Sequence, residues 1–301
     1  MQRKLLSFGH GYSARALSIR LKAKGWIIRG TTRTAEKTDG VASSGADPIV
    51  WPGSNIADVL ADTTDLLISA GPGQSGDPVL ATLRDEISAI APRLRWVGYL
   101  STTGVYGDHG GAWVDETTPV APSTQRGQLR AGAEAAWQAL ATDHGLPLHI
   151  FRLAGIYGPG RGPFAKVRAG TARRIIKPGQ VFSRIHVEDI ARVLEASIAQ
   201  PNPGAIYNLC DDDPAPPEDV IAYAAKLLGA PLPPSVDFET ADMTPMARSF
   251  YAESKRVSNQ RIKSELGVTL TYPNYRVGLQ DLLTRERRTE GAAEDARNPP
   301  E

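Results

Sequence analysis

Short apolar runs alternate with amphipathic segments over the first hundred residues of the chain. The apolar runs have the length of single β-strands and lie at 4–8, 26–33, 46–51, 65–70 and 94–100. Between them, leucine and isoleucine recur at helical spacing over 13–24, where Gly25 ends the segment, and a second helical segment covers 78–91. Strands that alternate with helices are typical of a parallel sheet. The pattern therefore predicts an α/β fold with a doubly wound parallel sheet, the Rossmann class.

A glycine-rich turn joins the first strand to the first helix. Its spacing is Gly-x-Gly-x-x-Ala, with Gly9, Gly11 and Ala14 at the defining positions. Gly9 accepts a sharp turn, Gly11 removes a side chain where the backbone would meet a pyrophosphate, and Ala14 lets the helix pack close to the strand. Helix N-termini bind anions, so the turn is expected to bind a dinucleotide. The residues expected to contact it are Gly9, Gly11, Tyr12, Ser13 and Ala14. The alternative is a plain strand–turn–helix.

The end of the second strand indicates which dinucleotide is bound. In NAD-binding versions of this turn, an acidic residue near that strand end accepts a hydrogen bond from the ribose 2′-hydroxyl. Here Thr32 and Arg33 occupy the place, and a guanidinium beside a hydroxyl suits a 2′-phosphate. We therefore expect NADP rather than NAD; the alternative is a merely solvated Arg33. The loop after the fourth strand is expected to approach the cofactor's ribose, because ligands bind off the carboxyl ends of parallel strands. This loop contains Ala70, Gly71 and Pro72.

Composition and charge narrow the range of partners. The chain has 301 residues, of which 41% are hydrophobic, and 34 basic against 33 acidic residues give a net charge of +1. A balanced charge does not favour a nucleic acid or an acidic membrane as partner. No apolar segment approaches the length of a membrane span, and the single cysteine, Cys210, fits a reducing compartment. We expect a cytoplasmic protein that binds a small molecule, without a metal site.

Four further segments follow the glycine turn in a recognisable order. The sequence Ser-Thr-Thr-Gly-Val-Tyr-Gly follows the fifth strand at 101–107, and the other segments lie at 151–161, 184–191 and 204–209. Together with the glycine turn they resemble the extended short-chain dehydrogenase/reductase family of NAD(P)-dependent, epimerase/dehydratase-like proteins. The resemblance spans roughly residues 3 to 283.

The resemblance implies a Rossmann core and a smaller, mainly C-terminal substrate-binding region, with the active site between them. The core would comprise 1–157 and about 182–209, and the substrate-binding region about 158–181 and 210–284. From 285 to 301 the chain is charged, rich in alanine and ends in proline, so we expect a disordered tail there. Family members often form homodimers through helices that flank the core, and the resemblance suggests a homodimer here.

The chain departs from the family at the catalytic helix. Family members carry Tyr-x-x-x-Lys there; the tyrosine transfers a proton, and the lysine binds the ribose and lowers the tyrosine pKa. Aligned on the glutamate that follows this motif, here Glu134, the chain has Arg126 and Arg130 at the two positions, and no tyrosine lies between 106 and 157. Arginine stays protonated, so Arg126 suits an electrostatic clamp for an anionic substrate and not a proton donor. Thr102 matches the hydroxyl that orients the substrate carbonyl. The chain is thus nearest to a branch that lacks the tyrosine.

Two other patterns look catalytic. Tyr251 and Lys255 spell Tyr-x-x-x-Lys, but they fall in the expected substrate-binding region, away from the strand ends. We interpret the match as coincidence, with Tyr251 left as a residue that could line the substrate site. His186 and Asp189 resemble a catalytic pair, and we expect the acids of that segment to cap a helix instead.

Two functions follow from these observations. The first is an NADP-dependent oxidoreductase or epimerase/dehydratase-like enzyme that acts on a small polar carbonyl or alcohol. Arg130 would bind the nicotinamide ribose, Thr102 the substrate oxygen, and Arg126 would stabilise charge on that oxygen. The proton would come from water, Tyr157 or Tyr106. The second function is a catalytically inactive NADP(H)-binding sensor, which the missing tyrosine favours. The family-like segments around the expected active site favour the enzyme.

Overall fold

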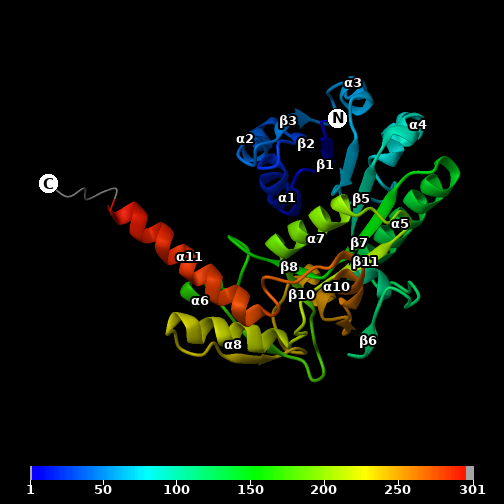
Figure 1. Ribbon diagram of the computed structural model, residues 1–301. Helices are drawn as coiled ribbons and strands as arrows, with labels where there is room; N and C mark the ends of the chain where they lie inside the picture. Colours follow the sequence, from blue (N-terminus) through cyan, green and yellow to red (C-terminus); the bar gives the residue numbers. More distant parts are fainter. Residues whose placement is uncertain (1, 296–301) are drawn as a thin grey trace.

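A seven-stranded parallel sheet forms the centre of the molecule (Figure 1). The computed structural model describes residues 2–295, with side chains up to residue 289. The strands lie in the order β11-β7-β5-β4-β1-β2-β3, and every neighbouring pair is parallel. They are β1 (Lys4–Phe8), β2 (Ile27–Thr32), β3 (Asp47–Val50), β4 (Asp65–Ile68), β5 (Trp96–Thr102), β7 (Leu148–Leu153) and β11 (Ile206–Leu209). The chain order reverses between β1 and β4, where open α/β sheets bind ligands.

Helices cover both faces of this sheet. Successive residues of a strand point to opposite faces, and Leu5 and Leu6 accordingly belong to two separate hydrophobic clusters. Leu5 packs in the cluster with α1 and α7, and Leu6 in the cluster with α3, α4 and α5. Figure 1 shows α1 and α7 on one side of the strands and α4 and α5 on the other. The helices are α1 (Tyr12–Lys22), α2 (Thr38–Ala42), α3 (Ala57–Ala61), α4 (Leu80–Ile90), α5 (Gln125–His144) and α7 (Val187–Ala199). The predicted doubly wound parallel sheet is confirmed.

The five predicted strands and two predicted helices are present, with boundaries shifted by at most two residues. The fifth strand begins at Trp96 rather than at 94, because the helix before it continues into a 3₁₀ turn, Ala91–Arg93. It also ends later, at Thr102. Thr102 is therefore the last residue of the strand, and a second 3₁₀ turn, Thr103–Tyr106, begins directly after it. A third 3₁₀ turn, Ala35–Lys37, precedes α2.

Segments that follow β5, β7 and β11 form a smaller region, in the lower part of Figure 1. Three two-stranded parallel sheets pair β8 with β10, β9 with β12 and β6 with β13. The strands are β6 (Trp113–Val114), β8 (Gly155–Tyr157), β9 (Arg174–Ile176), β10 (Arg184–His186), β12 (Ser235–Asp237) and β13 (Arg256–Val257). The helices are α6 (Phe164–Arg168), α8 (Pro217–Leu228), α9 (Pro245–Phe250), α10 (Gln260–Leu266) and α11 (Tyr275–Asp295).

A third hydrophobic cluster joins β8, α6, α8 and α11, with Tyr157 and Leu279 among its buried residues. Val257 of β13 and Ile262 of α10 instead pack in the same cluster as Leu5 of β1. The boundaries between a Rossmann core and a substrate-binding region stay a prediction.

The expectation of a disordered tail from residue 285 is wrong for 285–295, because α11 continues to Asp295. Arg285 pairs with Asp281 one turn earlier and with Glu188 at the start of α7. Alanine, arginine and glutamate are strong helix formers, and an ion pair four residues apart adds to helix stability. A composition that suggests disorder therefore also suits a charged helix. Residues 296–301 of the predicted tail lie outside the described residues.

Candidate active site

The glycine turn lies where the strand order reverses. Gly9 has a φ of +73°, and a Cβ placed on it would lie 2.8 Å from the amide nitrogen of Ala70, just after β4. A Cβ on Gly11 would meet no atom closer than 3.7 Å. Ala14 is fully buried in the cluster under α1. Gly9 therefore fixes the turn by close packing, whereas Gly11 leaves room for a Cβ or for a ligand atom at the start of α1.

Tyr12 and Ser13 are the first two residues of α1, where helix amides lack partners within the helix. The Tyr12 hydroxyl donates a hydrogen bond to the carbonyl of Pro159 (2.9 Å), and the Arg161 guanidinium lies 5.8 Å from the centre of its ring. Burial raises the pKa of Tyr12 to about 12. The Tyr12 side chain thus contacts the loop after β8, and its backbone amide is the part that is free to bind a phosphate.

The predicted 2′-phosphate residues, Thr32 and Arg33, have different surroundings. Thr32 is 8% exposed, and its carbonyl accepts a hydrogen bond from the amide of Trp51 (2.8 Å). Arg33, directly after β2, is exposed. A second arginine, missed by sequence reasoning, reaches from α1 towards α2: a Cβ on Gly40 would lie 3.1 Å from both terminal nitrogens of Arg15. The Nε of Arg15 is buried and has no hydrogen-bond partner in the described chain. Its only sequence signal is its position directly after the glycine motif.

Arg130 is fixed beside the loop that follows β4. Its Nη1 donates a hydrogen bond to the carbonyl of Leu100 (2.7 Å), which anchors the side chain on β5. Its Nη2 lies 3.8 Å from the position of a Cβ on Gly71. The neighbouring Ala70 is the residue against which Gly9 packs. The structure therefore brings together three predicted parts of the site: the glycine turn, the loop at 70–72 and Arg130.

Thr102 and Arg126 lie at the starts of two turns. The Thr102 hydroxyl accepts a hydrogen bond from the amide two residues later (3.2 Å) and caps the 3₁₀ turn after β5. Arg126 lies in the first turn of α5; its side chain is exposed, and its guanidinium is 5.8 Å from the ring centre of Phe250. Partial desolvation and the positive charges of Arg130 and Arg161 lower the pKa of Arg126, which stays a cation. We call Arg126, Arg130 and Arg161 the arginine cluster.

A buried ion pair holds α5 against the sheet. Glu134 of α5 and Arg152 of β7 are each 3% exposed, and Arg152 Nη2 lies 2.8 Å from Glu134 Oε2. The hydroxyl of Ser101, next to Thr102, donates to the same carboxylate. This carboxylate thereby links the helix that carries Arg126 and Arg130 to the end of β5.

The two tyrosines considered as proton sources are both buried and hydrogen-bonded. The Tyr106 hydroxyl donates to Oδ1 of Asn208 (2.7 Å), and the Tyr157 hydroxyl to the carbonyl of Asn274 (3.4 Å). Burial raises the pKa of both hydroxyls, and the nearby carboxylate of Asp211 raises that of Tyr157 further. A hydroxyl that is hard to ionise and already has a partner is a poor proton relay at neutral pH.

Tyr251 and Lys255 both have structural contacts. The Lys255 ammonium donates to the carbonyl of Gly107 (2.6 Å) and pairs with Glu253 (2.7 Å). The Tyr251 ring packs edge-on against Phe182, with ring centres 5.5 Å apart. The lysine thus ties the segment after α9 to the turn after β5.

His186 caps α7 itself, so the expectation that the acids of this segment form the cap is wrong. Its Nδ1 accepts a hydrogen bond from the amide of Glu188 (3.2 Å), and burial lowers the pKa of His186 to about 4, which keeps the ring neutral. Asp189 accepts hydrogen bonds from the amides of Thr271 (2.8 Å) and Tyr272 (2.9 Å). The acid holds a distant loop, and the imidazole takes the place at the helix end that sequence reasoning gave to carboxylates.

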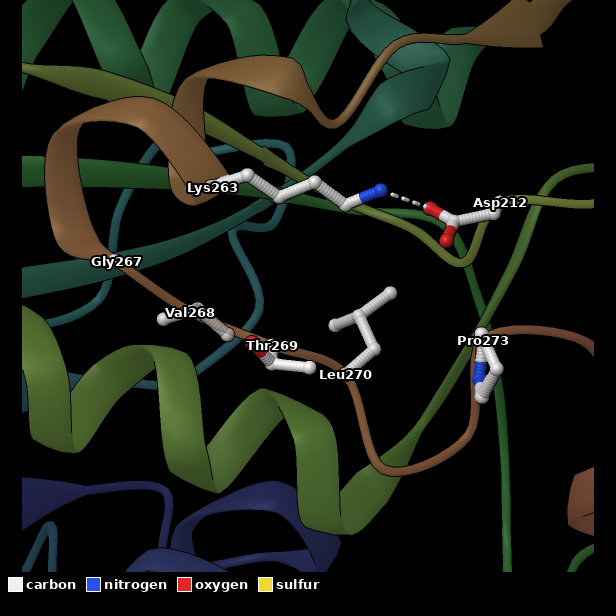
Figure 2. Close-up of a pocket in the computed structure, with 7 residues that line it drawn as sticks. All are labelled: Asp212, Lys263, Gly267, Val268, Thr269, Leu270 and Pro273. Carbon is white, nitrogen blue, oxygen red and sulfur yellow. Dashed lines mark hydrogen bonds and ion pairs between the residues drawn. The ribbon is translucent and has the colours of Figure 1, made fainter.

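Two cavities lie outside the glycine turn. The larger, about 400 Å³, is bounded by segment 267–273 with Asp212 and Lys263, and Figure 2 shows these two side chains meeting across it. Their ion pair is 2.5 Å long, and none of the predicted site residues lines this cavity. The smaller, about 260 Å³, is lined by Arg161 and therefore adjoins the arginine cluster. Arg161 is the second residue that sequence reasoning missed: it lies in a segment already singled out, but its neighbours come from distant parts of the chain.

Residues 2–295 contain neither a metal-binding cluster nor a membrane-spanning helix. No group of three or more His, Cys, Asp or Glu side chains is placed there to hold a metal ion. In the same range, no helix is long and apolar enough to cross a membrane.

Comparison with known proteins identifies relatives over almost the whole chain. Protein YeeZ of Escherichia coli (strain K12) is 31% identical over 290 residues, which cover 90% of this chain and 97% of the relative. The structure of a functionally unknown conserved protein from Silicibacter pomeroyi DSS is 63% identical, with a TM-score of 0.91 and coverage of 94% of this chain and 99% of that one.

A more distant structure shares the fold. UDP-glucuronic acid 4-epimerase from Bacillus cereus, in complex with NAD, is 16% identical, with a TM-score of 0.76 and coverage of 94% of this chain and 97% of that one. The model of the NAD dependent epimerase/dehydratase family matches residues 82–210, from α4 to the end of β11. The chain belongs to the NAD-dependent epimerase/dehydratase family.

Proposed function

We propose that the protein is an NADP-dependent oxidoreductase or epimerase/dehydratase-like enzyme that acts on a small polar carbonyl or alcohol with arginine in place of the family tyrosine. One observation carries the proposal. Arg130 is anchored on β5 beside the loop at 70–72, and Arg126 stands one turn before it on the same helix. Arg130 therefore lies beside the place where the strand order reverses, and Arg126 lies on the same helix.

The residues around the glycine turn fit a dinucleotide. The room at Gly11, where a Cβ would meet only the Gly9 carbonyl at 3.7 Å, would admit a pyrophosphate to the amides at the start of α1. Arg33 and Arg15 would bind a 2′-phosphate: Arg33 is exposed, and the buried Nε of Arg15 lacks a partner in the described chain. Arg130 would bind the nicotinamide ribose. When bound, the cofactor supplies a hydride donor or acceptor.

The remaining side chains would position and polarise the substrate. The Thr102 hydroxyl would hold the substrate oxygen, and Arg126 would stabilise negative charge on it. Because the hydroxyls of Tyr106 and Tyr157 are buried and hydrogen-bonded, water is the better proton source. A cytoplasmic location and a homodimer stay predictions.

The same observations support a second candidate function. Without a tyrosine free to relay a proton, a nucleotide site alone would make the protein an NADP(H) sensor. The two functions differ in what Arg126 does. In an enzyme, Arg126→Gln should lower turnover strongly and leave NADPH binding nearly unchanged; in a sensor, no turnover exists to be lowered.

Titration with NADPH and NADH tests the proposal. We expect the wild-type chain to prefer NADPH, and Arg33→Gln and Arg15→Gln each to weaken NADPH about tenfold while NADH binding is unchanged, since each removes a charge-assisted hydrogen bond. Arg84→Gln, an exposed substitution on α4, is the matched control and should change neither. Equal affinity for the two nucleotides would refute the NADP assignment, and no binding of either would refute both functions. NADPH oxidation with a panel of carbonyl compounds then separates enzyme from sensor.

A further inference from the structure

The smaller cavity carries two positive charges and no negative charge. It lies between the loop after β8, the start of β10, and helices α8 and α11, with a volume of about 260 Å³. Arg161 and Arg184 are the charged residues in its wall, and no carboxylate of the described chain lines it. Two guanidinium groups in one wall, with no carboxylate among the lining residues, favour an anion, because a carboxylate accepts charge-assisted hydrogen bonds from both.

Arg184 is held in place but not neutralised. Its Nη1 donates hydrogen bonds to the carbonyls of Phe182 (2.8 Å) and Ala215 (3.0 Å). Within residues 2–295, its Nε and Nη2 make no hydrogen bond and the guanidinium forms no ion pair. Burial lowers the pKa of Arg184. Burial also raises the pKa of the neighbouring Asp211 carboxyl to about 8, so at pH 7 that group is protonated and does not balance the charge of Arg184. Three donors of the planar guanidinium remain for a ligand, enough for the two parallel hydrogen bonds that a carboxylate accepts.

Arg161 connects this cavity to the glycine turn. Its guanidinium lies 5.8 Å from the ring centre of Tyr12, the first residue of α1, and its charge lowers the pKa of Arg126. The side chain is exposed. An anion held between Arg161 and Arg184 would therefore lie next to the arginine cluster.

The rest of the wall is apolar. It includes Ile156, Val220 and Leu279 and the rings of Tyr157 and Tyr275. Such a wall suits a hydrocarbon or aromatic body better than a sugar, whose hydroxyls would lose their hydrogen bonds to water. The volume of about 260 Å³ is also below the range of pockets that hold drug-sized ligands, so a sugar nucleotide exceeds it.

We propose that this cavity binds a small carboxylate with an apolar, aromatic body, and that Arg161 and Arg184 hold its carboxylate. That this ligand is the substrate rests on the proposed function; the binding itself does not.

Titration of the nucleotide-free chain with 3-phenylpropanoate, by calorimetry, tests the site apart from any NADP binding. We expect saturable binding, and at least about tenfold weaker binding in Arg161→Gln and in Arg184→Gln, because each loses a charge-assisted hydrogen bond. The neutral amide of the same acid should bind at least about tenfold more weakly for the same reason. Arg173→Gln is the control: Arg173 is exposed, its Nη1 donates only to carbonyls of its own loop, and it does not line the cavity.

Arg184→Gln removes two bonds to the backbone and can disturb folding, so Arg161→Gln, at an exposed side chain, keeps the test decisive. No saturable binding, equal binding of acid and amide, or full affinity in Arg161→Gln would overturn the proposal. If Arg161→Gln keeps full affinity for the probe and also weakens NADPH binding, Arg161 belongs to the cofactor site instead. Binding of the probe without binding of NADPH would refute the proposed function alone.

Discussion

The two sides of the candidate site are held together by different kinds of contact. On the side of β1, β2 and β4, the contacts start from backbone amides: the amide of Gly9 donates to the Thr31 hydroxyl (2.9 Å), and the amide of His10 to the Thr31 carbonyl (2.8 Å). On the side of β5 and α5, the contacts are made by long side chains, above all Glu134 with Arg152. The side made by the backbone depends on glycines, where an added side chain would disturb the turn. The side made by side chains depends on buried charges that must be paired.

The difference also appears in the buried titratable groups. His10 lies under the turn, where a Cβ on Gly30 would be 2.5 Å from its ring, and burial together with the charge of Arg15 lowers the pKa of His10 to about 4. Just after β11, on the half of the sheet that holds β5, burial raises the pKa of Asp211 to about 8. Both groups are therefore neutral at pH 7, but they respond to pH in opposite directions. Six substitutions, three of them controls, test the difference between the two sides.

The largest effect is expected from Glu134→Gln. It keeps the shape of the side chain and leaves Arg152 buried without a counter-charge, which costs about 3–5 kcal/mol of the free energy of unfolding. Glu286→Gln breaks an exposed ion pair with Arg168 and should cost less than about 1 kcal/mol. Urea denaturation measures both. Similar losses in the two variants would show that the buried pair does not hold α5 as described.

Gly9→Ala should have the second-largest effect on stability, and it should disturb the glycine turn on the side of β1, β2 and β4. The added Cβ meets backbone at 2.8 Å, and φ is +73°, so we expect a loss of about 2–3 kcal/mol in stability and at least about tenfold weaker NADPH binding as the turn moves. Gly25→Ala has the same strain, at φ +80°, with nothing within 4 Å. It should be destabilised less, by about 1 kcal/mol, and bind NADPH normally. NADPH titration of both variants checks this; equal losses of affinity would mean that strain, rather than contact with Ala70, sets the turn.

The side made by the backbone is the one that the sequence predicts well. A glycine spacing is local, so Gly9, Gly11 and Ala14 can be recognised from six residues, and apolar runs place the strands to within two residues. Arg130 was found only through the family resemblance, because nothing local distinguishes it from other arginines. Arg15 and Arg161 were missed because what marks them is tertiary: a buried Nε without a partner in the described chain, and a ring 149 positions away (161 minus 12).

The same limit explains the errors. The cap of α7 is His186, and no propensity rule favours histidine there over the neighbouring acids. The charged segment from 285 has the composition of a disordered tail, yet Arg285 meets Glu188 from a segment almost a hundred residues earlier. Pairings at such separation depend on the folded chain and leave no local pattern.

Asp211→Asn should have the smallest effect on stability at pH 5, where the folded carboxyl is already neutral, and its effect should appear in the pH dependence instead. The carboxyl of an unfolded chain has a pKa near 3.9, and that of folded Asp211 is about 8. Between these values the folded state holds a proton that the unfolded state has released, so this group's contribution to stability falls as pH rises. We therefore expect the variant's free energy of unfolding to decrease less than that of the wild type from pH 5 to pH 8, as measured by urea denaturation.

The free energy of unfolding of the variant is compared with that of the wild type at each pH, because the buried histidines change stability with pH in the opposite direction. His10, with a folded pKa of about 4 against about 6.5 when unfolded, adds stability as pH rises through that window, and this contribution cancels in the difference. Asp143→Asn, at an exposed carboxylate near the end of α5, is the control and should leave the pH dependence in place. If the free energy of unfolding depends on pH in the same way in Asp211→Asn and in the wild type, Asp211 is ionised in the folded chain. It would then balance the charge of Arg184 and weaken the case for an anion in the smaller cavity.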